Sequence, residues 1–133
     1  MSQENIAVVQ SFYDALGRGD VGTVLGLMDE NIEWNEAEHF VYADHSPYVG
    51  PNNVLNGLFM RLITEWEGFK AIPEKIISTD DTVAAMGRYR GTYRETGKTV
   101  NAQVVHVFTV KDGRLTRFQQ YTDTAQFRDA TTK

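Results

Sequence analysis

The 133-residue sequence contains no cysteine. This absence excludes disulfide bonds, thiolate nucleophiles and cysteine-ligated zinc. No apolar run approaches the ~20 residues that cross a bilayer, and the first ten residues lack the basic and then apolar pattern of a secretory signal. We therefore expect a cytoplasmic, soluble protein that does not enter a membrane.

Basic residues are fewer than acidic residues. Eighteen acidic side chains against thirteen basic ones give a formal net charge of -5, which argues against nucleic-acid partners and anionic membrane surfaces. A glycine-rich phosphate loop and the Gly-x-Ser-x-Gly elbow of serine hydrolases are both missing. The hydrophobic share of 41% is ordinary, and no repeat or linker divides the chain, so residues 1–133 are predicted to form a single domain.

Helical periodicity occupies the first half of the chain. A first helix is predicted from apolar residues at helical spacing, namely Ile6, Val9, Phe12, Tyr13 and Leu16. Asp20 can cap a short second helix, and Pro51 suits the first turn of a third helix that runs to Trp66. Between them, 32–35 alternates like a short strand, whereas 36–50 is polar and aperiodic and is interpreted as a loop.

The second half has the composition of strands. Strands are predicted over residues 69–79, 82–94, 99–110 and 115–124, with turns between them. The tail from Ala125 is expected to fray. Helices first and an antiparallel sheet afterwards predict an α+β fold whose helices cover one face of the sheet.

The last hairpin is the clearest local signal. Asp112-Gly113 suits a two-residue type I′ turn, because both residues need positive φ. That turn pairs Lys111 with Arg114 and, in a regular ladder, His106 with Gln119. One face then turns from apolar to polar away from the turn, which is typical of a pocket wall. Its residues are Ala102, Val104, His106, Phe108 and Val110 on one strand, and Leu115, Arg117, Gln119, Tyr121 and Asp123 on the other.

Six short segments, in order, resemble one family. They are 11–16 with Gly19-Asp20, 32–34, 48–51, 95–98, 106–115 and 121–125. Together they are similar to the SnoaL-like branch of the ketosteroid-isomerase and nuclear-transport-factor-2-like superfamily, with its cystatin-like barrel. The resemblance implies a cone, in which a curved antiparallel sheet wraps around a long helix and leaves a cavity open at one end. It also implies a homodimer joined through the sheet.

Members of this superfamily include isomerases, polyketide cyclases, epoxide hydrolases and dehydratases, as well as proteins without known chemistry, so the site must decide function. In SnoaL-like cyclases an aspartate on the last strand is the general acid and base, and Asp123 matches that position. The alternative is a solvated carboxylate at the strand end. His106 is a second catalytic candidate, able to donate to a substrate oxygen or relay a proton. The alternative is a core histidine bonded to Gln119.

Five further residues are candidates for substrate binding. Tyr13 would polarise a carbonyl, as a tyrosine does in the isomerases, or simply pack in the core. Trp34 would stack on a flat ligand or belong to the core, and Tyr48 would line the mouth. Gln119 and Tyr121 share the pocket face of the last strand. In a regular hairpin Asp123 lies ~13 Å beyond Gln119, too far for a direct bond to His106 unless a bulge intervenes.

The 36–50 loop concentrates carboxylates and imidazoles, namely Glu36, Glu38, His39, Asp44 and His45. No His-x-His or Glu-x-x-His spacing appears, so a solvated acidic lid is favoured over a metal site, and no cofactor is expected. The sequence predicts acid/base chemistry on a small carbonyl compound, with Asp123 moving the proton and His106 and Tyr13 stabilising the enolate. The alternative function is a non-catalytic ligand-binding or dimerisation module.

Overall fold

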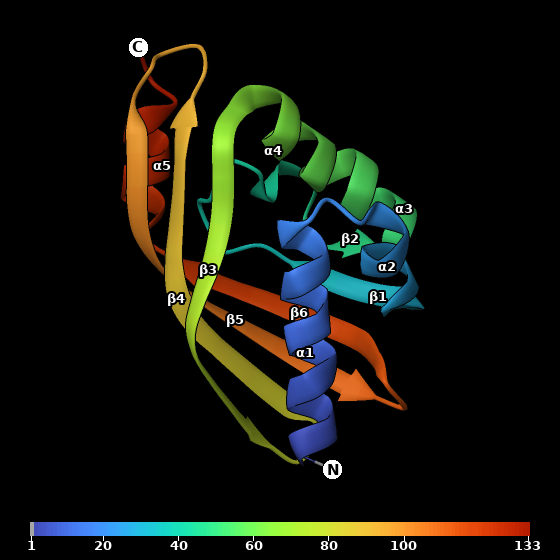
Figure 1. The fold of residues 1–133 in the computed structure, drawn as a ribbon. Coiled ribbons are helices and arrows are strands. Elements are labelled where there is room, and N and C mark those ends of the chain that lie inside the picture. The colour runs from blue at the N-terminus through green and yellow to red at the C-terminus, as the bar shows by residue number, and fades with distance from the viewer. Residues whose placement is uncertain (1) are drawn as a thin grey trace.

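A curved, unclosed sheet with helices on its concave side and at its edges forms the architecture (Figure 1). The computed structural model describes residues 2–133. The sheet has six strands in the order β2-β1-β6-β5-β4-β3. Helix α1 (Ser2–Gly17) lies across the hollow of the sheet, and α5 (Thr124–Ala130) lies against β5 (Thr99–Lys111). This matches the predicted α+β cone.

The elements follow one another closely. The strands are β1 (Met28–Asn35), β2 (Tyr48–Val49), β3 (Trp66–Thr79), β4 (Thr82–Tyr93), β5 (Thr99–Lys111) and β6 (Arg114–Thr122). The helices are α1 (Ser2–Gly17), α2 (Val21–Gly26), the 3-10 turn η1 (Ala43–His45), α3 (Pro51–Val54), the π-turn η2 (Leu55–Phe59), α4 (Met60–Glu65) and α5 (Thr124–Ala130). Within residues 2–133, none of these helices has the length and apolarity required to cross a membrane.

Helices α2 and α3 begin at the residues that the sequence predicted. Asp20 caps α2, since its carboxylate accepts the backbone N–H of Thr23 at 3.1 Å. Pro51 opens α3, as predicted. The third helix continues through the π-turn η2 to Glu65, and Trp66 already begins β3. Gly57 lies in that π-turn, where a Cβ atom would stand only 2.7 Å from the ring of the buried Tyr48.

The strand pairing combines a meander with one parallel pair. Strands β3 to β6 pair with their sequence neighbours in antiparallel fashion, as expected. Strand β1 instead runs parallel to β6, with Trp34 beside Phe118, and carries the short β2 on its other side. Strands β2 to β5 and helices α3 and α4 lie between β1 and β6 in the sequence, so no local pattern predicts this parallel pair. The result brings the start of the 36–50 loop next to the end of β6.

The last hairpin has the predicted turn and a different register. Asp112 and Gly113 have φ of 52° and 76°, and Lys111 pairs with Arg114. A β-bulge then follows, because Val110 pairs with Leu115 but Thr109 pairs with Arg117. His106 therefore pairs with Gln120, and the predicted pairing with Gln119 is wrong. One extra residue also inverts which side chains of β6 face inward.

The C-terminal tail is helical, so the expectation that it frays is wrong. Phe127 on α5 is fully buried. The centroid of its ring lies 4.9 to 6.2 Å from the centroids of four other aromatic rings, those of Phe40, Trp66, Phe69 and Tyr89. The hydroxyl of Thr96 donates to the carbonyl oxygen of Ala130 at 2.6 Å. The tail is part of the core because Phe127 completes this aromatic cluster.

We expect Phe127→Ala to lower the free energy of unfolding by about 3–5 kcal/mol, through lost burial and a residual cavity. Denaturant unfolding followed by circular dichroism measures the change. The neighbouring exposed Arg128 provides the control, and Arg128→Ala should change stability by less than about 0.5 kcal/mol. A Phe127→Ala protein as stable as the Arg128→Ala protein would show that α5 is not docked.

Candidate functional site

A chain of polar side chains crosses the aromatic interior of the sheet. His106 on β5 and Gln120 on β6 are 6% and 2% exposed, and both lie among apolar core residues. The rings of Phe108 and Phe118 are 6.1 and 4.8 Å from the imidazole ring of His106. Buried polar groups need hydrogen-bond partners to remain stable there. The partners of these two side chains come from helix α1, strand β4 and the 36–50 loop.

The imidazole of His106 is bonded at both nitrogens. Its Nδ1 lies 2.6 Å from the hydroxyl of Tyr13 on α1, and its Nε2 lies 2.5 Å from the hydroxyl of Tyr89 on β4. Gln120 donates through Nε2 to the Tyr89 hydroxyl at 2.8 Å. The backbone N–H of Ala37 donates to Oε1 of Gln120 at 3.0 Å. A continuous chain therefore runs from Ala37 to Tyr13, which we call the buried chain.

The backbone N–H of Ala37 sets the direction of every bond in the buried chain. An N–H only donates, so the Gln120 amide must present its oxygen to Ala37 and its NH₂ to Tyr89. Tyr89 thus accepts from Gln120 and sends its own proton to Nε2 of His106. The histidine then carries its proton on Nδ1 and donates it to the oxygen of Tyr13. Reversing the last two bonds would leave the Tyr89 proton buried without an acceptor.

The buried chain is uncharged. Burial lowers the pKa of His106 to about 3, so its imidazole is neutral at physiological pH. Burial likewise raises the pKa of Tyr13 and of Tyr89 above the usual value for tyrosine. Both phenols remain protonated in the working range. The chain therefore supplies oriented dipoles without a net charge.

Glu36 is the one buried carboxyl group beside this chain, immediately before Ala37. It is 7% exposed, and Nε1 of Trp34 donates to its Oε2 at 3.2 Å. Burial raises the pKa of Glu36 to about 8, against the lowering effect of the Trp34 bond. The charge of Glu36, when present, adds to the effect of burial in raising the pKa of Tyr89. Glu36 therefore holds a proton at pH 7 and releases it just above.

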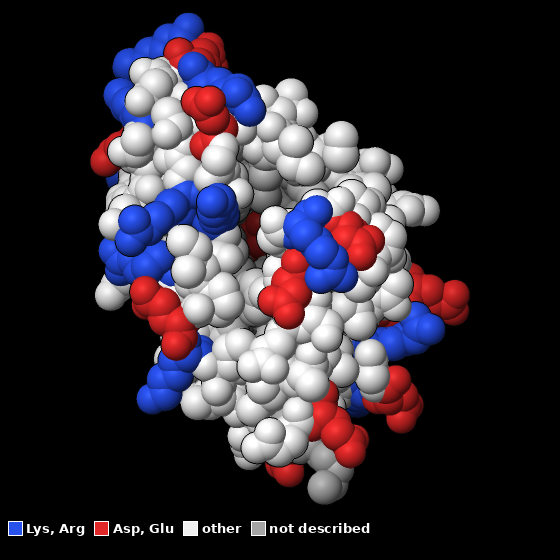
Figure 2. Space-filling model, in the orientation of Figure 1, with Lys and Arg blue, Asp and Glu red and all other residues white. Residues whose placement is uncertain are grey.

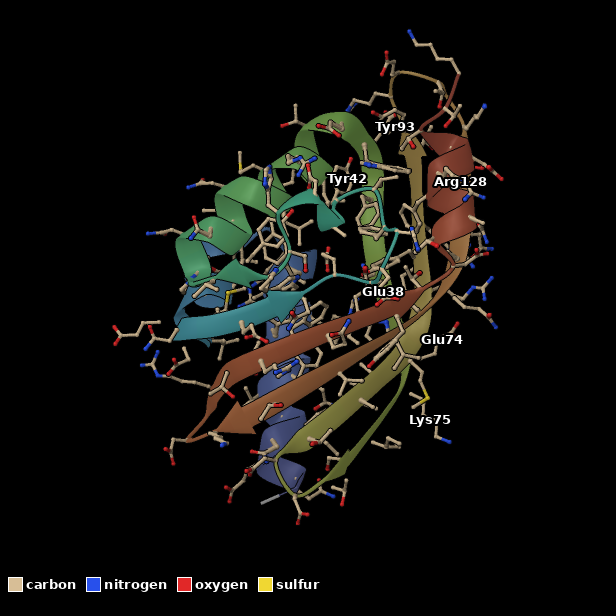
Figure 3. All side chains as sticks on the ribbon, turned by 180° about the vertical axis from the view of Figure 1, so that it is seen from behind. Glu38, Tyr42, Glu74, Lys75, Tyr93 and Arg128 are labelled. Carbon is tan, nitrogen blue, oxygen red and sulfur yellow. The ribbon has the colours of Figure 1, made fainter. Side chains whose placement is uncertain are left out.

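Tyr13 also borders an open groove between α1 and β3, with a volume of about 340 Å³. Its lining residues are Ile6, Gln10, Tyr13, Asp14, Pro73, Glu74, Lys75 and Ile76. Figure 2 shows the surface hollowed between basic side chains over the β3 side and the side chains over α1, with acidic atoms visible in its depth. Glu74 and Lys75 lie at the sheet edge on β3 (Figure 3). Tyr13 is therefore shared by the groove and the buried chain.

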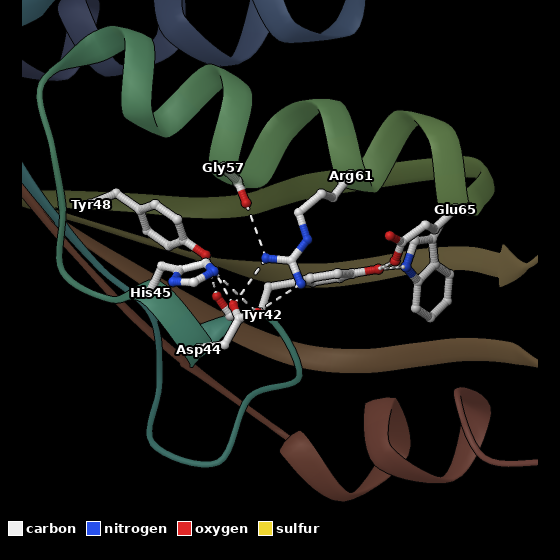
Figure 4. Close-up of polar contacts among 8 residues, drawn as sticks. Tyr42, Asp44, His45, Tyr48, Gly57, Arg61 and Glu65 are labelled. Atoms are coloured by element: carbon white, nitrogen blue, oxygen red, sulfur yellow. Dashed lines mark hydrogen bonds and ion pairs between the residues drawn. The ribbon is translucent and has the colours of Figure 1, made fainter.

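The 36–50 loop is held firmly against the helices (Figure 4). Arg61 of α4 binds both carboxylate oxygens of Asp44, at 2.9 and 3.0 Å, and its guanidinium lies 4.6 Å above the ring of Tyr42. Tyr42 donates to Glu65 at 2.6 Å and accepts from Nε1 of Trp66 at 2.8 Å. This bidentate, stacked arrangement orders the loop that carries Glu36 and Ala37. The loop is thus not the solvated lid that its composition predicts.

The predicted residues of β6 and its end lie outside the interior. Asp123 is exposed at the start of α5, where Nε2 of Gln126 donates to its Oδ2 at 3.1 Å. Tyr121 is 57% exposed. Gln119 is half-buried and bonds the backbone oxygen of Gln120. The predicted shared face with His106 is wrong, because the bulge turns these three side chains away from it. Asp123 and Tyr121 instead border a groove of about 580 Å³ on the outer face of the sheet.

The four other predicted residues are buried or, for Tyr13, half-buried. Tyr13 and His106 are bonded to each other, as described. Trp34 stacks on Phe118, with ring centroids 3.7 Å apart and planes 16° apart, so its face is occupied by protein. Tyr48 is buried and donates to the backbone oxygen of Tyr42 at 2.6 Å. Its predicted place at the mouth is therefore wrong.

Sequence reasoning missed Glu36, Tyr89 and Gln120. Alternation was a usable signal for the first, since Ile32, Trp34 and Glu36 fall on one face of β1 and its extension, and all three are buried. Tyr89 likewise continues the buried alternation of Val83 and Ala85 on β4. Gln120 had no such signal, because the bulge breaks the alternation of β6. Across residues 2–133, no group of three or more His, Asp or Glu side chains is arranged to hold a metal ion.

Comparison with known proteins gives a consistent result. A family model described as a SnoaL-like domain matches residues 9–118. An NTF2-like protein from Burkholderia thailandensis is 32% identical, with a TM-score of 0.92 and coverage of 100% of this chain and 99% of the other. No curated protein sequence matches this chain significantly.

Two more distant structures share the fold. An LEH-like epoxide hydrolase from M. tuberculosis is 22% identical, with a TM-score of 0.76 and coverage of 97% of this chain and 90% of the other. TerC, crystallised with polyporic acid, is 23% identical, with a TM-score of 0.83 and coverage of 96% and 97%.

The raised pKa of Glu36 predicts a pH-dependent stability. The folded protein keeps a proton that the unfolded chain releases above its ordinary pKa of 4.5. The contribution of Glu36 to the free energy of unfolding is therefore largest below pH 4.5 and is lost as pH rises towards 8, by about 1.4 kcal/mol per pH unit. Urea unfolding from pH 5 to 8 should show this decline in the wild type relative to Glu36→Gln. The exposed neighbour provides a control, since Glu38→Gln should follow the wild type; parallel curves for Glu36→Gln and wild type would contradict the assignment.

Proposed function

Because the chain belongs to the SnoaL-like domain family, whose superfamily includes polyketide cyclases and isomerases, we propose that it is a cofactor-independent enzyme acting on a small carbonyl compound. The reaction type is proton transfer at carbon, leading to isomerisation, cyclisation or dehydration. The observation that carries this proposal is a buried carboxyl group of high pKa, Glu36, which immediately precedes Ala37, the first donor of the neutral, directed chain.

Glu36 has the properties that a carbon acid requires of its base. An ordinary carboxylate is too weak a base to take a proton from carbon. A carboxylate with a pKa of about 8 is a stronger base and is still partly ionised at neutral pH. In its ionised form Glu36 takes the proton from the carbon next to a carbonyl group. The electron pair moves onto the carbonyl oxygen as an enolate. The resulting Glu36 acid then returns the proton to carbon, and both the enzyme and the electron count are restored.

The enolate oxygen needs donors that do not compete by ionising. Burial raises the pKa of Tyr13, so this phenol keeps its proton, and its oxygen accepts from Nδ1 of His106. The protons of Tyr89 and His106 are used within the buried chain, so Tyr13 is the donor that remains for the enolate oxygen. Such preorganised dipoles lower the energy of a developing negative charge without reorganising. Two proteins of the same fold are linked to small molecules, namely the LEH-like epoxide hydrolase and TerC, which was crystallised with polyporic acid. They support a small ligand for this fold.

A second candidate is a binding or dimerisation module without chemistry. Trp34 stacks on Phe118, and its ring centroid also lies 5.4 Å from that of Phe59. These contacts favour a module without chemistry, because protein side chains occupy that part of the interior. The two functions differ in what they require of Glu36. A binding module does not need its carboxyl group to change protonation.

Exchange of carbon-bound hydrogen in D₂O tests the enzymatic proposal without knowledge of the natural substrate. We expect the wild type to accelerate deuterium uptake beside the carbonyl group of 1-indanone and of small cyclic enones, followed by proton NMR. The rate should rise with pH and level off above about 8, because the ionised form of Glu36 is the base. Glu36→Gln should reduce the enzymatic rate at least about 100-fold, the usual value of a positioned base.

Asp123→Asn is the informative companion variant. The family resemblance assigns the acid/base role to Asp123, whereas its exposed position favours Glu36 instead. Loss of exchange in Asp123→Asn with full activity in Glu36→Gln would return the role to Asp123. Exchange by the wild type no faster than by buffer, for all ketones, would favour the binding module.

We also propose a homodimer that forms through the outer face of the sheet. Ile72, Ile77 and Tyr121 are large apolar side chains that are 39 to 57% exposed on the strands of this sheet, and the 580 Å³ outer groove includes Met86 and Val105. Apolar area of this kind is typical of an interface. Light scattering should give twice the monomer mass for the wild type, and the monomer mass for Tyr121→Arg, with unchanged circular dichroism. A monomeric wild type at micromolar concentration contradicts the proposal.

A further inference from the structure

We propose that the ring of Phe127 occupies a binding site for a flat aromatic ring, and that helix α5 is the gate of this site. The site is the space enclosed by the rings of Phe40, Trp66, Phe69 and Tyr89, which we call the aromatic cage. The ring of a ligand replaces that of Phe127 when α5 moves away. The inference deepens the proposed function and rests on it for the role of the ligand, since the ring is that of the carbonyl substrate.

The walls of the aromatic cage do not depend on α5. They come from the 36–50 loop, β3 and β4, and they pack on one another. The ring centroid of Phe69 lies 5.6 Å from that of Trp66 and 5.2 Å from that of Tyr89. Trp66 is supported further by Tyr93, at 5.1 Å. Aromatic pairs at these separations are favourable by themselves, so the cage keeps its shape when Phe127 leaves and has room for one six-membered ring.

Helix α5 is attached to the protein by little apolar surface. Only Phe127 and Ala130 are buried among its seven residues, and a helix this short is not stable by itself. The other contacts of α5 and the residues after it are polar. They are the hydroxyl of Thr96 with the oxygen of Ala130 at 2.6 Å, Nζ of Lys98 with the oxygen of Thr132 at 2.6 Å, and the side chain of Gln126 with the backbone of Asn101 at 2.9 and 3.1 Å. A chain end held in this way opens at much lower free energy than the sheet unfolds.

The aromatic cage borders both parts of the candidate site. The ring of Tyr89 is a wall of the cage, and its hydroxyl belongs to the buried chain. Phe40 is another wall, and it lies in the loop that carries Glu36. Burial, and after it the charge of Glu36, raises the pKa of Tyr89, so the carboxyl group interacts with this wall. Neither of the two grooves described above is lined by Glu36. We therefore assign the approach to Glu36 to the space that Phe127 fills.

The chemistry of the aromatic cage selects a neutral, apolar ring. None of its four walls bears a charge, and its two polar hydrogen atoms, on Nε1 of Trp66 and the hydroxyl of Tyr89, are both used within the protein. A charged group would lose its hydration there without gaining a partner. The planes of Phe40 and Tyr89 stand at 67° and 87° to that of Phe127, in T-shaped contacts. A phenyl ring makes these contacts better than a saturated ring of the same size.

Toluene and methylcyclohexane test the inference, because both have the size of the Phe127 side chain and only toluene is aromatic. NMR titration of the isotope-labelled wild type gives both affinities, and amide hydrogen exchange with and without the ligand reports on α5. We expect toluene to bind about 5-fold more tightly than methylcyclohexane. Toluene should also accelerate exchange of the amides of residues 127–130 at least about 10-fold, because it displaces the helix, whereas a ligand bound elsewhere leaves their exchange unchanged or slows it.

Three variants separate the gate from a general cavity. Thr96→Val removes the hydroxyl that holds Ala130 and should tighten toluene binding about 5-fold, because a larger fraction of the molecules is open. Phe127→Ala removes the occupant and should tighten it about 10- to 100-fold. Thr122→Val is the matched control. Its hydroxyl also donates at 2.6 Å to a backbone oxygen, but to that of Gln103 on β5 and not to α5, so this variant should bind toluene like the wild type.

The inference is overturned if toluene leaves the exchange of α5 unchanged in the wild type, if methylcyclohexane binds as tightly as toluene, or if Thr96→Val and Thr122→Val bind toluene equally. Binding by Phe127→Ala alone also counts against the gate, because an apolar cavity made by a substitution takes up small aromatic molecules in any case.

Deuterium exchange of 1-indanone separates this inference from the proposed function. Toluene should compete with 1-indanone for the aromatic cage and slow its exchange. Opening of α5 by toluene, without exchange of any ketone by the wild type, would retain the site and reject the catalysis. Exchange that depends on Glu36 and that toluene does not slow would retain the catalysis and reject this site.

Discussion

The interior of this protein depends on a single extra residue in β6. Thr116 is left unpaired between Leu115 and Arg117, and from there on the inward and outward positions of the strand are exchanged. Phe118 and Gln120 consequently face the interior, and Tyr121 faces solvent. Without the bulge the amide of Gln120 would point outward, and neither Ala37 nor Tyr89 would have its present partner. A local irregularity of the backbone thus selects the polar residues of the site.

The site combines side chains that hold their protons with one that can release its proton. Desolvation keeps His106 neutral and protonates Tyr13 and Tyr89 throughout the physiological range. The same desolvation brings the pKa of Glu36 to about 8, where a modest change of environment ionises it. Environments that separate the protonation states of neighbouring groups are what acid/base chemistry needs. Here one physical cause, burial among aromatic rings, acts on both kinds of group.

Contacts of the 36–50 loop with helix α4 help to maintain the position of Glu36. The bidentate contact of Arg61 with Asp44 and the stacking of that guanidinium on Tyr42 attach the 36–50 loop to α4. Because Gly57 has no Cβ atom, the ring of Tyr48, in the same loop, can pack closely against the backbone of Gly57. Phe127 on α5 packs against the rings of Phe40, in the same loop, and of Tyr89 on β4. Residues outside the buried chain therefore help to determine how Ala37 meets Gln120.

The sequence by itself determined much of the fold, because its signals are local. Helical spacing predicted α1, Asp20 and Pro51 marked helix starts, and Asp112-Gly113 determined the turn of the last hairpin. It also identified His106 and Tyr13 as candidates. The site itself was decided by tertiary structure. The inward orientation of Gln120 depends on a bulge that no residue pattern marks, and the same bulge places Asp123 outside the interior. The parallel pairing of β1 with β6, and the burial of Glu36 and Phe127, likewise depend on packing between segments distant in the chain. Periodicity reports which face of a strand is apolar, whereas the environment of one carboxyl or imidazole group depends on all the elements that surround it.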